Sequence, residues 1–239
     1  MLEICVESLE SAVIAEAGGA DRLELCAHLQ LDGLTPNAEL TRQVIEAVSI
    51  PVTVLIRPRD GSFHYRAHEV EQMLAEIETA KRACAAGVTV GALNLGQHVD
   101  VPLCCELVDA ARPMEVTFHR AFDVISNLSH ALEDVIRTGA VRLLTSGGAP
   151  NVLDGAERIA RLREQAAGRV EIMAGGGLRL TNLLEVRRIS GVASLHASLL
   201  TRPPAHAVPV GGLRQGLPCL RLEDVREAAR MMRIQLQPA

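Results

Sequence analysis

The sequence predicts a single α/β domain with the TIM-barrel fold, a closed parallel barrel of eight strands surrounded by helices. Short runs rich in Val, Ile and Leu alternate about eight times with amphipathic runs of helical length, as βα units require. The chain has 239 residues, slightly under the roughly 250 that are typical of this fold. No GxGxxG motif follows the first apolar run, which disfavours the runner-up, a doubly wound open sheet.

Each strand candidate is a short run with β-branched or other large apolar residues. In chain order the candidates are 2–6, 22–26, 52–57, 88–92, 115–119, 141–146, 169–174 and 193–198. The segments between them have helical length and periodicity, for example "SLESAVIAEAGG" and "EVEQMLAEIETAKRACAAG". Many of them end in glycine, the usual stop residue of a helix, as at Gly18, Gly87, Gly139 and Gly168.

The last unit is irregular. Segment 201–220, "TRPPAHAVPVGGLRQGLPCL", is rich in Pro and Gly and precedes a final helix near 221–232. It follows the last strand, whose C-terminal end opens at the active face of a barrel, so we expect a mobile lid there. With no linker and no repeat beyond the βα rhythm, we expect residues 1–239 to form one domain.

Composition and charge exclude several classes of function. The net charge is −5 and the sequence pI is about 5.9, so a basic face for nucleic acid is not expected. No segment approaches the roughly 20 apolar residues of a membrane helix, and the acidic start "MLEICVESLE" is unlike a signal peptide. Six cysteines form no CxxC pair and no disulfide framework, which favours a reducing cytoplasm.

Alternation along the strands directs polar side chains into the barrel interior. In the first strand Glu3 and Cys5 share the face opposite to the apolar one. The same rule places a larger set inside: Arg22, Glu24 and Cys26, then Thr117 and His119, then Ser194, His196 and Ser198, with Arg57, Arg142, Ser146 and Glu171 on the same side. Such charges either neutralise one another in a polar core or surround a ligand. The size of the set favours a ligand site at the C-terminal mouth.

The stretch "VTFHRAFD" ends the fifth strand candidate with ionisable groups. His119 is delivered to the mouth, where barrel enzymes place their working groups, and it becomes an acid or base candidate together with Glu24. The alternative for His119 is a hydrogen-bonded core histidine. For Arg120 and Asp123 we expect an ion pair that holds the loop in place.

Two glycine loops follow adjacent strand candidates, "LTSGGAP" (144–150) and "MAGGGL" (173–178). Glycines let backbone N–H groups approach an anion closely, and barrels often bind phosphate near their last loops. We therefore predict one phosphate or carboxylate site, with Arg57 as its counter-charge. Its residues are Arg57, Ser146, Gly147, Gly148, Gly175, Gly176, Gly177 and Ser198. The alternative is that these glycines only make tight turns.

Cys5 and Cys26 occupy corresponding ends of two neighbouring strand candidates, on the interior side. Two thiolates across a short gap suit a soft ion such as Cu(I). Cysteine is also among the most frequently buried residues, so packing alone is the competing interpretation and the spacing by itself favours it.

The chain resembles the CutC family, which is named for a proposed part in copper homeostasis. The matching stretches, in order, are "LEICVES", "GGADRLELC", "GLTP", "IRPRDGSFHY", "VTFHRAFD", "LTSGG", "IMAGGG" and "LHAS". The resemblance runs from residue 2 to about residue 200. It implies a cytoplasmic TIM barrel that forms homo-oligomers, and it places Cys5 and Cys26 on the two proposed copper(I) cysteines of the family.

Some positions depart from the family pattern. Asp32 replaces the first glycine of its "GGLTP", the loop "GALNLGQHVD" (91–100) lacks the usual Asp-Gly, and the tail after residue 200 matches poorly. Three functions therefore remain open. They are a Cu(I)-binding protein of copper homeostasis, an enzyme of lyase or isomerase type acting on a small anionic or phosphorylated metabolite, and a structural oligomer with a vestigial site.

Overall fold

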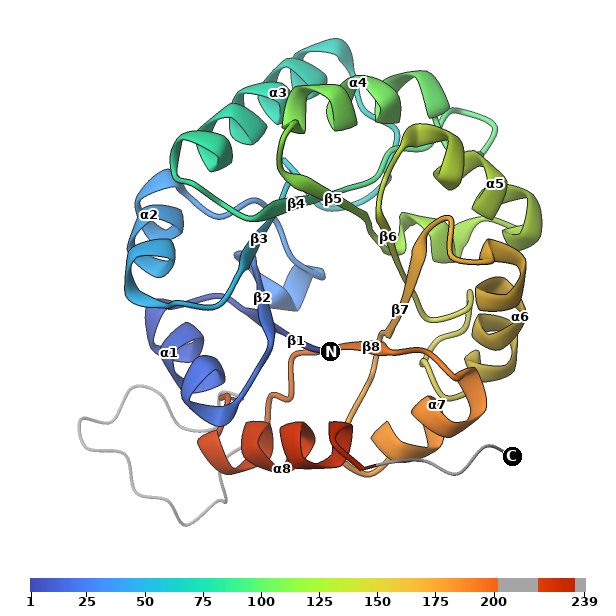
Figure 1. Cartoon of the computed structure of the whole chain (residues 1–239). Helices are drawn as coiled ribbons and strands as arrows, with labels where there is room; N and C mark the ends of the chain where they lie inside the picture. Colours follow the sequence, from blue (N-terminus) through green and yellow to red (C-terminus); the bar gives the residue numbers. More distant parts are fainter. Residues whose placement is uncertain (202–218, 235–239) are drawn as a thin grey trace.

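The computed structural model, which describes residues 1–201 and 219–234, is a closed barrel of eight parallel strands paired in chain order. The helices lie outside the strands (Figure 1). The first strand pairs with the last, and Leu2 lies opposite Leu195 in the register. The TIM-barrel prediction is confirmed.

The strands agree with the sequence prediction to within one or two residues at each end. They are β1 (Leu2–Val6), β2 (Arg22–Leu25), β3 (Val52–Leu55), β4 (Gly87–Val90), β5 (Glu115–Phe118), β6 (Arg142–Thr145), β7 (Glu171–Gly175) and β8 (Ser194–Ala197). The helices are α1 (Leu9–Gly18), α2 (Ala38–Ala47), α3 (Ala67–Arg82), α4 (Val101–Ala111), α5 (Leu128–Thr138), α6 (Ala156–Ala166), α7 (Leu183–Ser190) and α8 (Leu222–Met232). Two 3₁₀ turns, η1 (Leu29–Leu31) and η2 (Arg120–Val124), follow β2 and β5.

Short-range capping chemistry sets several helix ends. The Asn37 side chain accepts a hydrogen bond from Leu40 N at the start of α2, and the Asn127 side chain accepts one from His130 N at the start of α5. At the other end of α5, Gly139 adopts a left-handed conformation with φ 83°, which costs a residue without Cβ little. The start of α2 and both ends of α5 are thus set by local residues.

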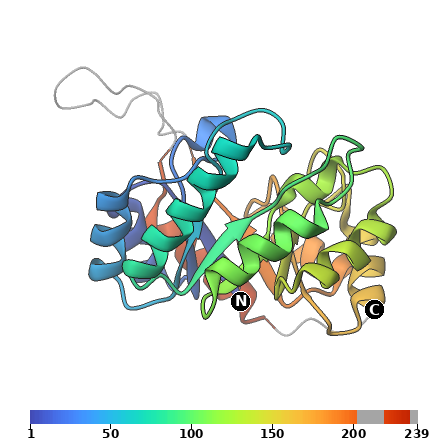
Figure 2. The ribbon, with the colours of Figure 1, turned by 90° about the horizontal axis from the view of Figure 1, so that it is seen from above.

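The helix-facing sides of the strands form the main apolar core, and the interior carries the polar groups. Leu2, Ile4 and Leu23 are fully buried in the core around the barrel. The register then brings interior side chains into rows, because Glu3 lies opposite Arg22 and also opposite His196. One residue pair further along, Cys5 lies opposite Glu24. In the edge-on view of Figure 2 the helices pack along the outside of the strands.

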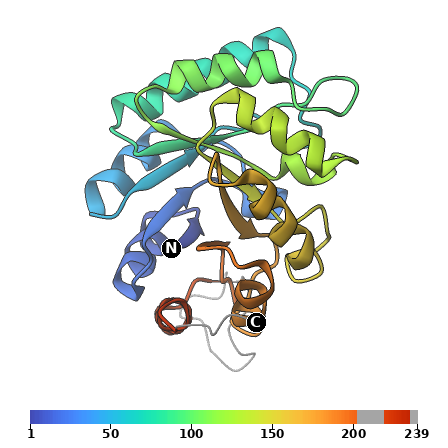
Figure 3. The same cartoon turned by 45° about the vertical axis from the view of Figure 1, so that its right-hand side comes forward.

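The last helix, α8, completes the outer ring of helices and packs between α1 and α7 (Figure 3). A Cβ on Gly18 would lie 2.5 Å from Val225 Cβ, so α1 and α8 approach closely at this glycine. The predicted final helix is therefore confirmed. Thr201 and Cys219 pair through two backbone hydrogen bonds of 3.0 and 2.9 Å. The predicted lid, 201–220, falls almost wholly on residues 202–218, outside the described residues.

Among the described helices, none has the length and apolar character needed to cross a membrane.

Candidate functional site

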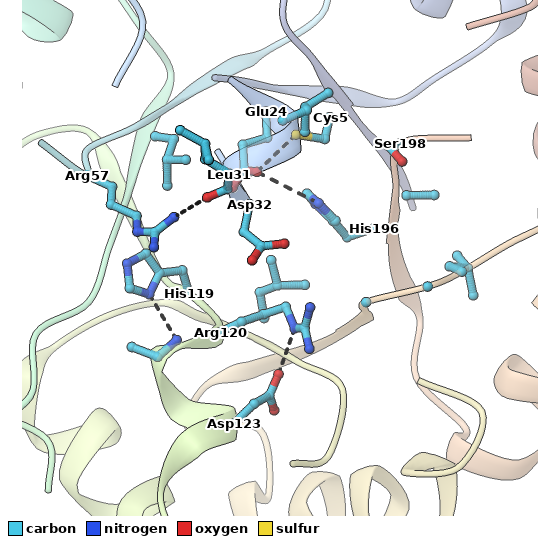
Figure 4. Close-up of a pocket in the computed structure, with 18 of the residues that line it drawn as sticks. Cys5, Glu24, Leu31, Asp32, Arg57, His119, Arg120, Asp123, His196 and Ser198 are labelled. Atoms are coloured by element: carbon cyan, nitrogen blue, oxygen red, sulfur yellow. Dashed lines mark hydrogen bonds and ion pairs between the residues drawn. The ribbon is translucent and has the colours of Figure 1, made fainter. Parts of the chain in front are cut away.

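A cavity of about 740 Å³ opens at the C-terminal ends of the strands. Figure 4 shows the side chains that surround it. Seven of the predicted site residues line it: Cys5, Glu24, Arg57, His119, Gly176, Gly177 and Ser198. Five others do not, namely Cys26, Ser146, Gly147, Gly148 and Gly175. The predicted acid–base candidates and part of the predicted anion site therefore share one volume.

Below the cavity, some interior charges neutralise one another, as the polar-core interpretation expects. Arg142 Nε donates to Glu171 Oε2 at 2.8 Å, and Arg22 Nε donates to Glu3 Oε2 at 2.5 Å. The Ser194 hydroxyl also donates to Glu171. Glu24 and Arg57 do not form an ion pair with each other. Mutual neutralisation therefore explains the charges below the cavity but not the charges that line it.

Cys5 and Cys26 meet where β1 and β2 end. Their Sγ atoms lie 3.5 Å apart, and both thiols are buried and free. Leu55 and Leu29 pack against the pair, and the turn at Gly33 closes over Cys26. The hydrogen bond with Cys26 and burial raise the pKa of the Cys5 thiol well above its usual value. The two cysteines thus lie side by side, with Leu55 and Leu29 packed against them and the Glu24 carboxylate hydrogen-bonded to Cys5.

His196 lies between two buried carboxylates. Its Nδ1 is 2.7 Å from Glu3 Oε1, and its Nε2 is 3.8 Å from Glu24 Oε2. Burial lowers the pKa of His196, but the charge of Glu24 and the contact with Glu3 outweigh it and leave that pKa raised. Burial raises the pKa of Glu3, yet His196 and Arg22 reverse this and lower it to about 2.

The buried carboxylate of Glu24 is only partly compensated. Its Oε2 accepts a hydrogen bond from Cys5 Sγ at 3.4 Å, whereas its Oε1 is buried with no hydrogen-bond partner among the described residues. Burial raises the pKa of Glu24, and the positive charge of His196 opposes this. The Thr89 hydroxyl also lowers this pKa, although it makes no hydrogen bond to Oε1. Glu24 therefore holds a proton more readily than an exposed glutamate.

His119 is held as a neutral ring. Its Nδ1 accepts a hydrogen bond from Ala121 N at 3.2 Å, so the proton of the neutral imidazole sits on Nε2. Burial and the charge of Arg57 lower the pKa of His119 to about 3. Nε2 is buried without a hydrogen-bond partner in the described part of the chain. The bond at Nδ1 fits the interpretation as a hydrogen-bonded core histidine, whereas a role of the Nε2–H group toward a ligand stays a prediction.

Arg57 is tied to the loops around the mouth more closely than the sequence indicates. Its Nη1 donates to Leu31 O at 2.8 Å and to Gly33 O at 2.9 Å, and its Nη2 donates to Gly61 O. Its guanidinium also lies over the Phe63 ring. Within the described part of the chain, Nε has no partner. Arg57 offers a ligand its positive charge and its Nε–H group, while both Nη1 hydrogens are taken by loop carbonyls.

The loop after β6 already holds an anion, and that anion is Asp123. Asp123 accepts hydrogen bonds from Ser146 N at 2.9 Å and Gly148 N at 3.0 Å, and Arg120 Nε pairs with it at 2.8 Å. Gly147 N is engaged by Thr145 Oγ1. The expected Arg120–Asp123 pair is confirmed. The backbone N–H groups of Ser146, Gly147 and Gly148 are therefore occupied within the protein, and those of Ser146 and Gly148 hold the segment that follows β5.

Sequence reasoning placed His196 on the interior face but gave it no role in the site. The signal was its position in "ASLHAS", where it alternates with two serines on a strand. Gly91 was also missed. A Cβ there would lie 2.4 Å from His119 Nδ1, so this glycine makes room for the imidazole ring.

Comparison with known proteins agrees with the motif pattern. The model of the CutC family matches residues 1–201. The chain belongs to the CutC family. A family protein CutC from Histophilus somni is 44% identical over 200 residues, which cover 84% of this chain and 82% of that protein. A human relative named "Copper homeostasis protein cutC homolog" is 46% identical over 198 residues, covering 83% of this chain and 72% of that protein.

A solved CutC structure from Streptococcus agalactiae has the same fold. It superposes with a TM-score of 0.78 at 29% identity, covering 83% of this chain and 98% of that one. The family match ends at Thr201. The resemblance of the sequence motifs to the family also ends there, at about residue 200. All the described residues that line the cavity lie within the matched part of the chain.

Proposed function

We propose that this CutC-family chain binds Cu(I) through Cys5 and Cys26 and acts in copper homeostasis within a reducing cytoplasm. The observation that carries the proposal is the 3.5 Å separation of two free, buried thiols. The names of its relatives, which refer to copper homeostasis, support the same role. Copper is here the cargo of the protein.

The surroundings of the thiols suit a soft ion. Thiolates prefer Cu(I) to hard cations, and the apolar side chains of Leu55 and Leu29 pack against the two cysteines. With metal–sulfur bonds of about 2.3 Å, a linear two-coordinate ion needs sulfurs about 4.6 Å apart. Binding therefore separates the sulfurs of Cys5 and Cys26 by about 1 Å. Cys5 lines the cavity and Cys26 does not, so copper enters past Cys5.

The test is a Cu(I) titration of the full chain against a competing chromophoric chelator under reducing conditions. Cys5→Ser, Cys26→Ser and the double variant should each bind about a hundredfold more weakly or worse, because one chelating site becomes a single ligand. Cys104→Ser is the matched control, since this thiol is also buried but bonds to Ala92 O elsewhere. Unchanged affinity in the double variant contradicts the proposal.

A second function, binding and conversion of a small anionic metabolite by a lyase- or isomerase-type enzyme, has separate support. Among the residues that the structure describes, three buried polar atoms without partners belong to residues that line the cavity: Arg57 Nε, His119 Nε2 and Glu24 Oε1. A carboxylate or phosphate would satisfy the two N–H groups, and Glu24 would act as acid or base. The cationic side chains of Arg120 and Arg179 line the same cavity.

Calorimetry with simple carboxylates and sugar phosphates tests this second function. His119→Gln keeps an N–H donor, whereas His119→Phe removes it. Losing one buried hydrogen bond to a charged ligand costs about 1.5–3 kcal/mol, so His119→Phe should weaken anion binding by about tenfold to hundredfold. Equal binding by wild type and His119→Phe, or no binding by wild type, contradicts it. Arg57→Ala is a poorer probe, because Arg57 also tethers η1.

A further inference from the structure

Three different donor atoms converge beside the thiol pair. Cys5 Sγ is 3.4 Å from Glu24 Oε2, and His196 Nε2 is 3.8 Å from the same oxygen. One donor atom from each of the three residues lies within 4.8 Å of the other two. All three residues line the cavity, as Figure 4 shows for Cys5, Glu24 and His196.

Two of these separations, the 3.4 and 3.8 Å distances to Glu24 Oε2, match the edges of a coordination tetrahedron. Metal–ligand bonds of about 2.0–2.3 Å place ligand atoms about 3.3–3.8 Å apart in tetrahedral geometry. In a cluster that is held together only by hydrogen bonds and binds no ion, each buried polar atom is expected to have a hydrogen-bond partner. Here Glu24 Oε1 is buried and unpartnered in the described structure, which leaves this carboxylate of a cavity-lining residue with unused capacity to bind an ion.

An outer residue fixes the orientation of the histidine. Glu3 Oε1 binds His196 Nδ1 at 2.7 Å, which turns Nε2 toward Glu24 and Cys5. Glu3 is itself held by Arg22. A carboxylate behind an imidazole is the usual support of a metal-bound histidine, because it fixes the ring and makes Nε2 a better ligand.

We propose that Cys5, Glu24 and His196 form a three-ligand site for a divalent ion of borderline softness, foremost Zn²⁺, with the fourth position open to the cavity. A mixed thiolate, carboxylate and imidazole set suits Zn²⁺, whereas Mg²⁺ and Ca²⁺ prefer oxygen alone and Cu(I) prefers sulfur. Three protein ligands and one open position are the pattern of zinc sites that bind an exchangeable ligand.

This site goes beyond the Cu(I) proposal, because Cys26 is not one of its ligands. The two ions share Cys5, so they exclude each other. The open position faces a cavity that also contains the free N–H groups of His119 and Arg57. A carboxylate or hydroxamate bound to the ion therefore fits the site. Glu24 cannot serve at once as a metal ligand and as a free acid or base.

The experiment titrates the reduced, metal-free full chain, without a histidine tag, with Zn²⁺ against a chromophoric chelator. Wild type should bind one Zn²⁺. Glu24→Gln and His196→Gln should each weaken Zn²⁺ binding by at least about tenfold. Cys26→Ser is the matched control and should keep Zn²⁺ affinity within about twofold while losing Cu(I). Glu24→Gln should show the reverse, keeping Cu(I) and losing Zn²⁺.

Co²⁺ supplies a second measurement that needs no variant to fold. Wild type with one equivalent of Co²⁺ should show a thiolate charge-transfer band and intense visible bands of a four-coordinate ion. Added acetohydroxamate should shift these bands by occupying the open position. The proposal is overturned if wild type binds neither ion stoichiometrically, or if Cys26→Ser loses Zn²⁺ as severely as Glu24→Gln. Neither result bears on whether the two thiols bind Cu(I).

Discussion

Asp123 and Ser146 are joined by three hydrogen bonds between the loops that follow β5 and β6. Ser146 N donates to both carboxylate oxygens, at 3.1 and 2.9 Å, and Ser146 Oγ donates to Oδ2 at 2.9 Å. Thr145 Oγ1 and Gly148 N bind Oδ1 as well. One buried carboxylate therefore binds donors from Thr145, Ser146 and Gly148 and fixes the wall of the cavity on that side.

Asp123→Ala should destabilise the fold by about 3–5 kcal/mol, because it strands buried N–H groups and leaves Arg120 without its partner. The measurement is urea unfolding at pH 7. Asp109→Ala is the control, since Asp109 pairs with Arg112 at the same spacing but both side chains are mostly exposed. It should change the free energy of unfolding little. Similar effects from both substitutions would show that the Asp123 contacts do not stabilise the loop.

The same residues show how far the sequence predicts the site. The βα rhythm is enough for the fold, and strand alternation is enough to place Cys5 and Glu24 on the interior. A glycine loop indicates that backbone N–H donors are available, but its sequence does not say which anion accepts their hydrogen bonds. Here the anion is Asp123, and only the three-dimensional adjacency of β5 and β6 reveals it. His196 gained its importance in the same way, from its closeness to Glu3 and Glu24 on other strands.

Cu(I) binding should strengthen with pH. The hydrogen bond with Cys26 and burial raise the pKa of the Cys5 thiol, so the thiol is protonated in the metal-free protein and must release its proton to bind. Each proton released makes the apparent affinity about tenfold higher per pH unit below that pKa. Competition titrations at pH 6.5 and 7.5, corrected for the protons of the chelator, measure this. An affinity that does not change with pH would mean that Cys5 binds no copper or is already ionised.

His119 should remain neutral across physiological pH. Its folded pKa is about 3 because burial and Arg57 disfavour the imidazolium, whereas the unfolded chain takes up a proton near pH 6.5. The unfolded state therefore binds more protons between these values, and His119 makes stability fall by about 1.4 kcal/mol per pH unit as the pH drops through that window. Above pH 6.5 the His119 side chain is neutral in both the folded and the unfolded state, so it adds no pH dependence to the stability there.

Two measurements check the His119 prediction. Unfolding free energies of wild type and His119→Asn should converge or cross as the pH falls from 6.5 toward 4, since the variant lacks this term. Nitrogen-15 NMR of the wild type should show the Nε2–H tautomer at pH 5, with the signal assigned through the variant. A His119 ring that titrates near pH 6 in the folded chain would contradict the prediction.

Gly91 should act as a positioning residue for His119. A Cβ at position 91 would lie 2.4 Å from Nδ1 and 2.5 Å from Cε1 of His119. The His119 ring has little room to move away, because the rings of Phe63 and Phe118 lie beside it, with their centroids 5.0 and 6.0 Å from the centroid of the imidazole. Gly91→Ala should therefore cost about 1–3 kcal/mol of stability through overpacking.

A double-mutant cycle separates this contact from a general effect of the glycine. In a His119→Ala background the clash is absent, so Gly91→Ala should cost much less there than in wild type, with a coupling energy of at least about 1 kcal/mol. The single variant should also displace the Nε2–H signal of His119, because the new methyl group pushes the ring away from Ala121 N. If the cost of Gly91→Ala is equal in both backgrounds, the glycine is required by the backbone and not by the imidazole ring.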